Sequence, residues 1–126
     1  MKKVVETTKA PAAIGPYSQA VINERLLFTA GQLGIDPATG NLVEGGAAEQ
    51  TVQIMENLGA VLDAGLSNYD KILKTTIYLV DIKDFAVVNE IYARYFHDKP
   101  PARSTVQVSA LPKGGLVEID CIAATV

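Results

Sequence analysis

The sequence predicts an α+β fold, a single domain over residues 1–126 in which two helices cover one face of a mixed β-sheet. Runs of β-branched and aromatic residues alternate with two segments of helical periodicity, in the order strands, helix, strand, helix, strands. The chain has 126 residues, of which 48% are hydrophobic and 20% charged, so it can bury one core but has no room for a second domain.

The first third of the chain predicts a loop followed by a β-hairpin. Residues 10–19 contain two prolines and a glycine, a composition typical of an ordered loop. Two strands are predicted at 20–22 and 26–32, joined by the turn-prone residues 23–25. Gly31 lies inside the second strand, where the missing side chain fits a β-bulge, the close approach of a ligand or backbone, or a simple steric requirement.

Two amphipathic helices are predicted in the middle of the chain. The first runs from 47 to 64 and ends at Gly65, because apolar residues recur at helical spacing at positions 48, 52, 55, 58 and 62. A buried strand over 72–80 follows. The second helix is capped by Asp81 and ends near His97, and five side chains are expected to form its core-facing side: Phe85, Val88, Tyr92, Tyr95 and Phe96.

The two C-terminal strands carry the candidate chemistry. Pro100 and Pro101 end the second helix, and the strand that follows places Arg103, Thr105 and Gln107 on one face. In the last strand, the even positions bring two acids into an otherwise apolar stripe: Leu116, Glu118, Asp120 and Ile122. We therefore expect Arg103 and Glu118 to line one small polar pocket, in which the guanidinium binds a substrate carboxylate and the acid transfers protons.

The sheet face that the helices leave uncovered is expected to be partly apolar as well. Alternation places Leu26 and Phe28 on one face, and Leu27 and Leu33 on the other. Because neither face is wholly polar, the uncovered one is predicted to be buried against other copies of the chain in a closed symmetric oligomer.

Composition and charge argue against several classes of function. A net charge of −3 and a sequence pI near 5.0 argue against nucleic-acid binding, and the chain lacks an apolar stretch of membrane-spanning length or a signal sequence. A soluble, cytoplasmic protein is expected. With one cysteine, Cys121, and one histidine, His97, the chain cannot form an internal disulfide or the usual zinc site, and Cys121 is predicted to be an inert buried thiol.

Several segments resemble the RidA (YjgF) family. The resemblance runs in order from about the tenth residue to the end of the chain and rests on residues 10–20 (APAAIGPYSQA), 30–32 (AGQ), 81–92 (DIKDFAVVNEIY), 101–104 (PARS), 111–113 (LPK) and 117–119 (VEI). It implies a chorismate-mutase-like fold assembled as a homotrimer, with a central sheet barrel and three pockets at the subunit interfaces. It also implies cofactor-independent hydrolysis of 2-aminoacrylate, 2-iminopropanoate and 2-iminobutanoate to 2-oxo acids and ammonia, without a metal.

The resemblance assigns a role to four residues. Arg103 would bind the substrate carboxylate, Glu118 would activate or position the water, Tyr17 would close the pocket, and the Gly31 backbone would contact the substrate. The chain departs from the family where Thr105 replaces a frequent cysteine, Ala30 a serine and Ala110 an arginine. These departures concern substrate preference and any role of a thiol.

Alternative interpretations remain at the level of the sequence. Arg103 and Glu118 could form a purely structural salt bridge, or Glu118 could be a strand-edge acid that faces solvent. The Thr105 hydroxyl either orients the water or imine nitrogen, or Thr105 is simply a strand residue chosen for packing. For the whole protein, the alternatives are a non-catalytic small-carboxylate-binding regulatory trimer, and an endoribonuclease or translation inhibitor.

Overall fold

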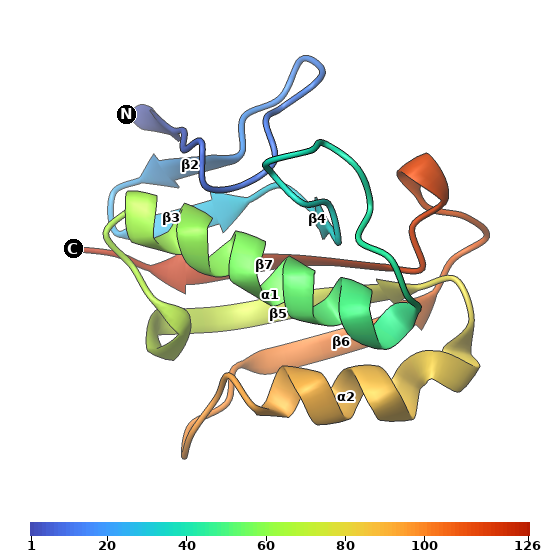
Figure 1. Cartoon of the computed structure of the whole chain (residues 1–126). Coiled ribbons are helices and arrows are strands. Elements are labelled where there is room, and N and C mark those ends of the chain that lie inside the picture. The colour runs from blue at the N-terminus through green and yellow to red at the C-terminus, as the bar shows by residue number, and fades with distance from the viewer.

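The computed structural model describes all residues 1–126 and shows two helices packed on one face of a seven-stranded mixed sheet (Figure 1). This confirms the predicted layers and element order. The strands are β1 (Lys2–Val5), β2 (Ala20–Asn23), β3 (Leu26–Thr29), β4 (Gln32–Leu33), β5 (Ile72–Leu79), β6 (Ala102–Gln107) and β7 (Val117–Ala124). The helices are α1 (Ala47–Ala64) and α2 (Phe85–Ala93).

The last strand, β7, lies in the middle of the sheet. The order across the sheet is β1-β2-β3-β7-β5-β6, and β4 also pairs with β7. All pairs are antiparallel except β5 and β6, which are parallel and are connected through α2. This arrangement makes β1 and β6 the two edge strands, so residues on β6 lie at the border of the chain.

The predicted strand over 26–32 is interrupted by a β-bulge. Phe28 pairs with Ile122 and Gln32 pairs with Ile119, so three residues of the first strand oppose two of β7. The extra residue reverses the side on which the following residues lie. Leu33 therefore pairs with Glu118 and shares its face, and the expectation that Leu33 lies on the same face as Leu27 is wrong.

The spacing of apolar residues in α1 did not correctly predict every side chain that the helix buries against the sheet. Val52, expected to be buried, is 40% exposed, whereas two amides are buried: Gln50 and Asn57. The Asn57 amide donates to the Leu33 and Ile35 carbonyls, and the Gln50 side-chain oxygen accepts from the Leu116 N–H. Because these two side chains form hydrogen bonds with backbone groups, they can be buried although they are polar.

Helix α2 is shorter than expected. Asp81 caps a 3₁₀ turn (Ile82–Asp84) by accepting a hydrogen bond from the Lys83 N–H, and α2 itself runs only from Phe85 to Ala93. Val88 and Tyr92 are buried as expected. Phe85 does not belong to the core, because its side chain is 36% exposed.

The core lies between the helices and the odd-numbered side of β7. Val117, Ile119, Cys121 and Ala123 alternate with half-buried even-numbered residues and pack against α1 side chains such as Met55 and Leu58. Burial raises the pKa of the Cys121 thiol to about 12.

We expect Cys121 to resist thiol reagents in the folded protein. With a pKa of about 12, only about one Cys121 thiol in 10⁴ is ionised at pH 8, and the side chain is 2% exposed. Iodoacetamide at pH 8 should therefore label Cys121 only after unfolding in guanidinium, as measured by mass spectrometry. Rapid stoichiometric labelling of the native protein would contradict the inert role.

The other face of the sheet carries no helix and presents a row of apolar side chains. Val4, Val21, Phe28 and Ile122 are paired successively across four strands, and Phe28 and Val4 are 38% and 52% exposed. Leu26 extends this row at 40% exposure. Separately, neither helix combines the length and the apolar composition that crossing a membrane would require.

Candidate functional site

Tyr17, Gly31 and Glu118 line one cavity of about 490 Å³, here called the Glu118 pocket. Tyr17 comes from the loop before β2, Gly31 from the bulge between β3 and β4, and Glu118 from β7. The remaining lining residues are 11, 12, 14 and 19 around the Tyr17 loop, then 30, 32, 33, 35, 37 and 40 around the bulge and the segment after β4, and finally 112 and 113. Three of the five site residues expected from the sequence are thus brought together by one chain.

Gly31 allows the Glu118 carboxyl group to lie directly against the backbone of the bulge. A Cβ atom at position 31 would be 2.5 Å from Glu118 Oε2 and 2.7 Å from its Cδ. No side chain fits there unless the carboxyl group moves. Of the interpretations left open for Gly31, the structure supports the bulge, and the group that approaches it closely is the Glu118 side chain, neither a ligand nor another backbone.

Replacing Gly31 with alanine should impair catalysis more than stability. The clash falls on the end of a flexible side chain, so the chain can fold, but the Glu118 carboxyl is displaced and kcat/KM should fall roughly 10²-fold. Steady-state kinetics and thermal unfolding of the variant check this. Gly46→Ala is the matched control, since a Cβ at Gly46 meets nothing within 4 Å. Wild-type kinetics for Gly31→Ala would contradict the prediction.

Partial burial makes Glu118 a stronger base than an exposed glutamate. Desolvation raises the pKa of its carboxyl group, and the nearby negative charge of Asp120 raises it further. Asp120 itself accepts a hydrogen bond of 3.2 Å from the Tyr78 hydroxyl on the same face. The sequence left open whether burial or Arg103 dominates the pKa of Glu118, and within one chain burial does.

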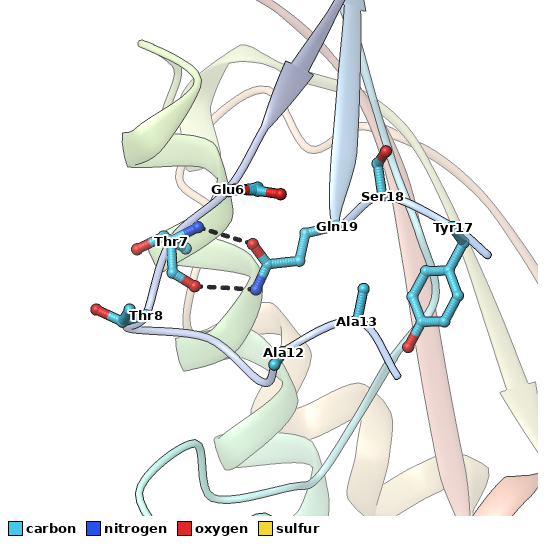
Figure 2. A pocket seen from close by; sticks show the side chains of 8 residues that line it. All are labelled: Glu6, Thr7, Thr8, Ala12, Ala13, Tyr17, Ser18 and Gln19. Atoms are coloured by element: carbon cyan, nitrogen blue, oxygen red, sulfur yellow. Dashed lines mark hydrogen bonds between the residues drawn. The ribbon is translucent and has the colours of Figure 1, made fainter. Parts of the chain in front are cut away.

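Gln19 fixes the loop that carries Tyr17. Its side chain is 4% exposed; its oxygen accepts from the Thr7 N–H, at 2.7 Å, and its nitrogen donates to the carbonyls of Thr7, Ala10 and Pro11. Figure 2 shows this amide beside Thr7, with Tyr17 at the other side of a second cavity of about 490 Å³ that shares Ala12, Tyr17 and Gln19 with the Glu118 pocket. Sequence analysis did not identify Gln19, because a glutamine between loop and strand carries no pattern that reveals buried hydrogen bonds.

Arg103 lies on the opposite face of the sheet from Glu118. Arg103 pairs with Thr75, whose hydroxyl is hydrogen-bonded to the Tyr92 hydroxyl of α2, so Arg103 is on the helix-covered face. Glu118 pairs with Tyr78, on the open face. Since the two side chains leave the sheet in opposite directions, one chain alone does not bring them into one pocket.

The surroundings of Arg103 come from α2. Its Nη1 donates a hydrogen bond of 2.7 Å to Asn89 Oδ1, and its Cζ lies 5.5 Å from the centre of the Phe85 ring and 5.1 Å from that of Tyr92. Sequence analysis assigned Phe85 and Tyr92 to the core and gave Asn89 no role. The signal was present in their spacing, because positions 85, 89 and 92 share one helix face.

Thr105 lies two residues beyond Arg103 on the same face of β6. Its Oγ1 is buried and has no hydrogen-bond partner within the chain. A buried hydroxyl group without a partner is costly, so a partner from outside the chain would stabilise it. The structure therefore contains two separate sets of groups: a base in a pocket, and an arginine beside an unpaired hydroxyl. No group of three or more His, Cys, Asp or Glu side chains is placed to hold a metal ion.

Comparison with known proteins gives a consistent result along almost the whole chain. Residues 7–125 match the model of the family described as endoribonuclease L-PSP. A Bos taurus protein named 2-iminobutanoate/2-iminopropanoate deaminase is 51% identical over 123 residues, which cover 98% of this chain and 90% of that protein.

Solved structures agree with the fold at high similarity. The Rid-family protein YyfA from Yersinia pestis has 52% sequence identity and a TM-score of 0.97, with 99% of this chain and 100% of that chain covered. TdcF from E. coli, solved with bound serine, has 38% identity and a TM-score of 0.93, with 98% and 99% covered.

Proposed function

The chain belongs to the RidA family, and we propose from this membership that it is an imine deaminase, which hydrolyses reactive imines and enamines to 2-oxo acids and ammonia. Its substrates are 2-iminopropanoate, 2-iminobutanoate and the enamine 2-aminoacrylate. The observation that carries the proposal is the near-complete similarity to a protein named for this activity, together with a carboxyl group of raised pKa in a cavity. A cytoplasmic location stays a prediction.

Glu118 moves the protons that the reaction requires. Its carboxylate takes a proton from water as the water oxygen attacks the imine carbon, and it returns that proton to the imine nitrogen, which gives a neutral carbinolamine. Glu118 then takes the hydroxyl proton and passes it to the amino nitrogen as the carbon–nitrogen bond breaks, so ammonia leaves and the 2-oxo group forms. Imine and water are thereby converted to a 2-oxo acid and ammonia. The raised pKa favours the first step, because it makes the carboxylate more basic.

Arg103 holds the substrate carboxylate. A planar guanidinium binds a carboxylate with two parallel charge-assisted hydrogen bonds, which fixes the imine carbon at a defined distance from the water. Thr105, on the same face, offers its unpaired hydroxyl to the same ligand. Tyr17 closes the other side of the pocket, and the Gly31 backbone contacts the substrate.

Each active site is assembled from two chains of a homotrimer. Arg103 lies on an edge strand and on the opposite face from Glu118, so a neighbouring chain must supply one of the two. The exposed apolar row on the open face supports burial against another copy. A chorismate-mutase-like trimer, in which the sheets form a central barrel with three pockets between subunits, meets both requirements.

Mixing two inactive variants tests the shared site. Arg103→Ala and Glu118→Gln chains, unfolded together and refolded, should form hybrid trimers in which about a quarter of the pockets contain both native residues. Activity should return to about that fraction of wild type, while each variant refolded alone stays inactive. Sedimentation analysis gives the oligomeric state. If the mixture remains inactive although hybrid trimers form, Arg103 of one chain and Glu118 of another do not share a pocket.

The activity itself is tested with a coupled assay. A threonine or serine dehydratase generates the imine, semicarbazide traps what remains, and the purified protein should lower the yield of semicarbazone in proportion to its concentration. If no wild-type preparation accelerates hydrolysis but 2-oxobutanoate still binds through Arg103, the protein is a carboxylate-binding regulator. The family description also justifies an RNA-cleavage assay, and cleavage that survives Arg103→Ala and Glu118→Gln would require a site elsewhere.

A further inference from the structure

One face of α2 surrounds the Arg103 guanidinium; we call its residues Phe85, Asn89 and Tyr92 the guanidinium cradle. The two rings lie 5.5 Å and 5.1 Å from Cζ, and the Asn89 oxygen accepts from Nη1 at 2.7 Å. Tyr92 is 4% exposed and hydrogen-bonded at 2.7 Å to Thr75 in the neighbouring strand. The base of the cradle is therefore fixed to the sheet, and Arg103 has a defined orientation before any ligand arrives.

All three contacts of the cradle leave the charge of Arg103 uncompensated. Two contacts are with aromatic rings and the third is with a neutral amide. Arg103 forms no ion pair, since the salt bridge in this chain joins Arg94 and Glu90 on the outer surface of the helix. Asn89 occupies one donor of the guanidinium, and the other donors make no hydrogen bond within the chain.

We propose that Asn89 is a positioning residue that orients Arg103 for carboxylate binding, and that its function depends on its being neutral. This inference rests on the proposed function of Arg103. A carboxylate at position 89 would bind the guanidinium more strongly, but it would compete with the substrate for the same charge. A neutral oxygen orients the guanidinium and leaves its charge available to the substrate. Because the side chain is already ordered, binding the substrate costs less conformational entropy.

The decisive variant is Asn89→Asp. It strengthens the hydrogen bond to the Arg103 guanidinium but offsets the positive charge that the substrate carboxylate would bind. We expect KM to rise about 10-fold or more, with a smaller change in kcat, and thermal stability to stay equal or increase. Asn89→Leu removes the acceptor and should raise KM less. Asn68→Asp introduces the same charge at an exposed position and is the matched control. A purely structural asparagine would give the reverse order, with Leu harmful and Asp tolerated, and that order would overturn the proposal.

Calorimetric binding of 2-oxobutanoate separates this inference from the failure of the deaminase proposal, because it does not require turnover. Weaker binding to Asn89→Asp than to Asn89→Leu supports the cradle even if no hydrolysis is found. Equal binding to wild type and Asn89→Asp, or no binding to wild type, overturns it.

A free guanidinium ion provides a second readout. In Arg103→Ala the cradle is empty but intact, so methylguanidinium should restore part of the lost 2-oxobutanoate binding. The same ion should have no effect on Arg103→Ala/Asn89→Leu. Restoration that is equal in both backgrounds would show that Asn89 does not position the cation, and absence of restoration in both would exclude a preformed cradle.

Discussion

Arg103→Ala should lower kcat/KM for imine hydrolysis by about 10²- to 10⁴-fold, because two hydrogen bonds between charged groups, worth about 1.5–3 kcal/mol each, are lost. The loss should fall mainly on KM and on inhibition by 2-oxobutanoate, since the guanidinium binds the carboxylate before and after the reaction. The coupled dehydratase assay and competitive inhibition measure both effects.

Arg103→Lys distinguishes charge from geometry. The lysine keeps the positive charge but cannot form the bidentate contact or stack between Phe85 and Tyr92, so it should recover only a small part of the lost kcat/KM. Arg94→Ala is the control, because Arg94 directly follows α2 but pairs with Glu90 at the surface. Full activity in Arg103→Lys would show that a point charge suffices and that the planar fork has no role.

Glu118→Gln should lower kcat by roughly 10²- to 10⁴-fold, the contribution of a positioned proton-transfer group, with little change in KM. The glutamine keeps the size of the side chain and its place beside Gly31 but cannot accept and return a proton. Single-turnover measurements with freshly generated 2-iminobutanoate separate this chemical step from product release. Glu90→Gln, at an exposed position of α2, is the matched control.

The same substitution should affect stability in a pH-dependent way. Burial raises the pKa of Glu118 within the folded chain, and Arg103 of the neighbouring chain opposes this shift. With burial as the larger effect, ionisation of Glu118 favours the unfolded state, and the stability present at low pH is lost as the pH rises through the folded pKa. Glu118→Gln removes this loss. The difference in thermal midpoint, Glu118→Gln minus wild type, should therefore become more positive from acidic to neutral pH. A difference that is independent of pH would mean that the pocket does not disfavour the charged carboxylate.

Local sequence patterns predicted most of the fold. Strand alternation correctly placed Glu118 and Asp120 together and Cys121 in the core, and helical spacing located both helices. The patterns were less reliable where polar side chains are buried or apolar ones exposed. On α1, the polar Asn57 is buried and the apolar Val52 is exposed. Asn57 can be buried because its amide donates hydrogen bonds to the carbonyls of Leu33 and Ile35, and the hydrophobicity of a residue does not reveal such bonds.

The candidate site was predictable as a set of residues but not as an arrangement. The sequence and its family resemblance pointed to Tyr17, Gly31, Arg103, Thr105 and Glu118, and one chain brings three of these into a pocket. Asn89 and Gln19 were missed, since their roles consist of hydrogen bonds to groups distant in the sequence.

By itself, the sequence determined the order of strands and helices and which residues share a face within each strand. Only the tertiary structure decided how those faces match between strands, because strand register and the position of α2 depend on contacts between distant segments. The bulge at Gly31 moved Leu33 to the side of Glu118, and the parallel pairing of β5 and β6 placed Arg103 under α2. The two-residue period of a strand determines which side chains share a face. Packing and strand pairing determine whether that face is covered by the helices or open.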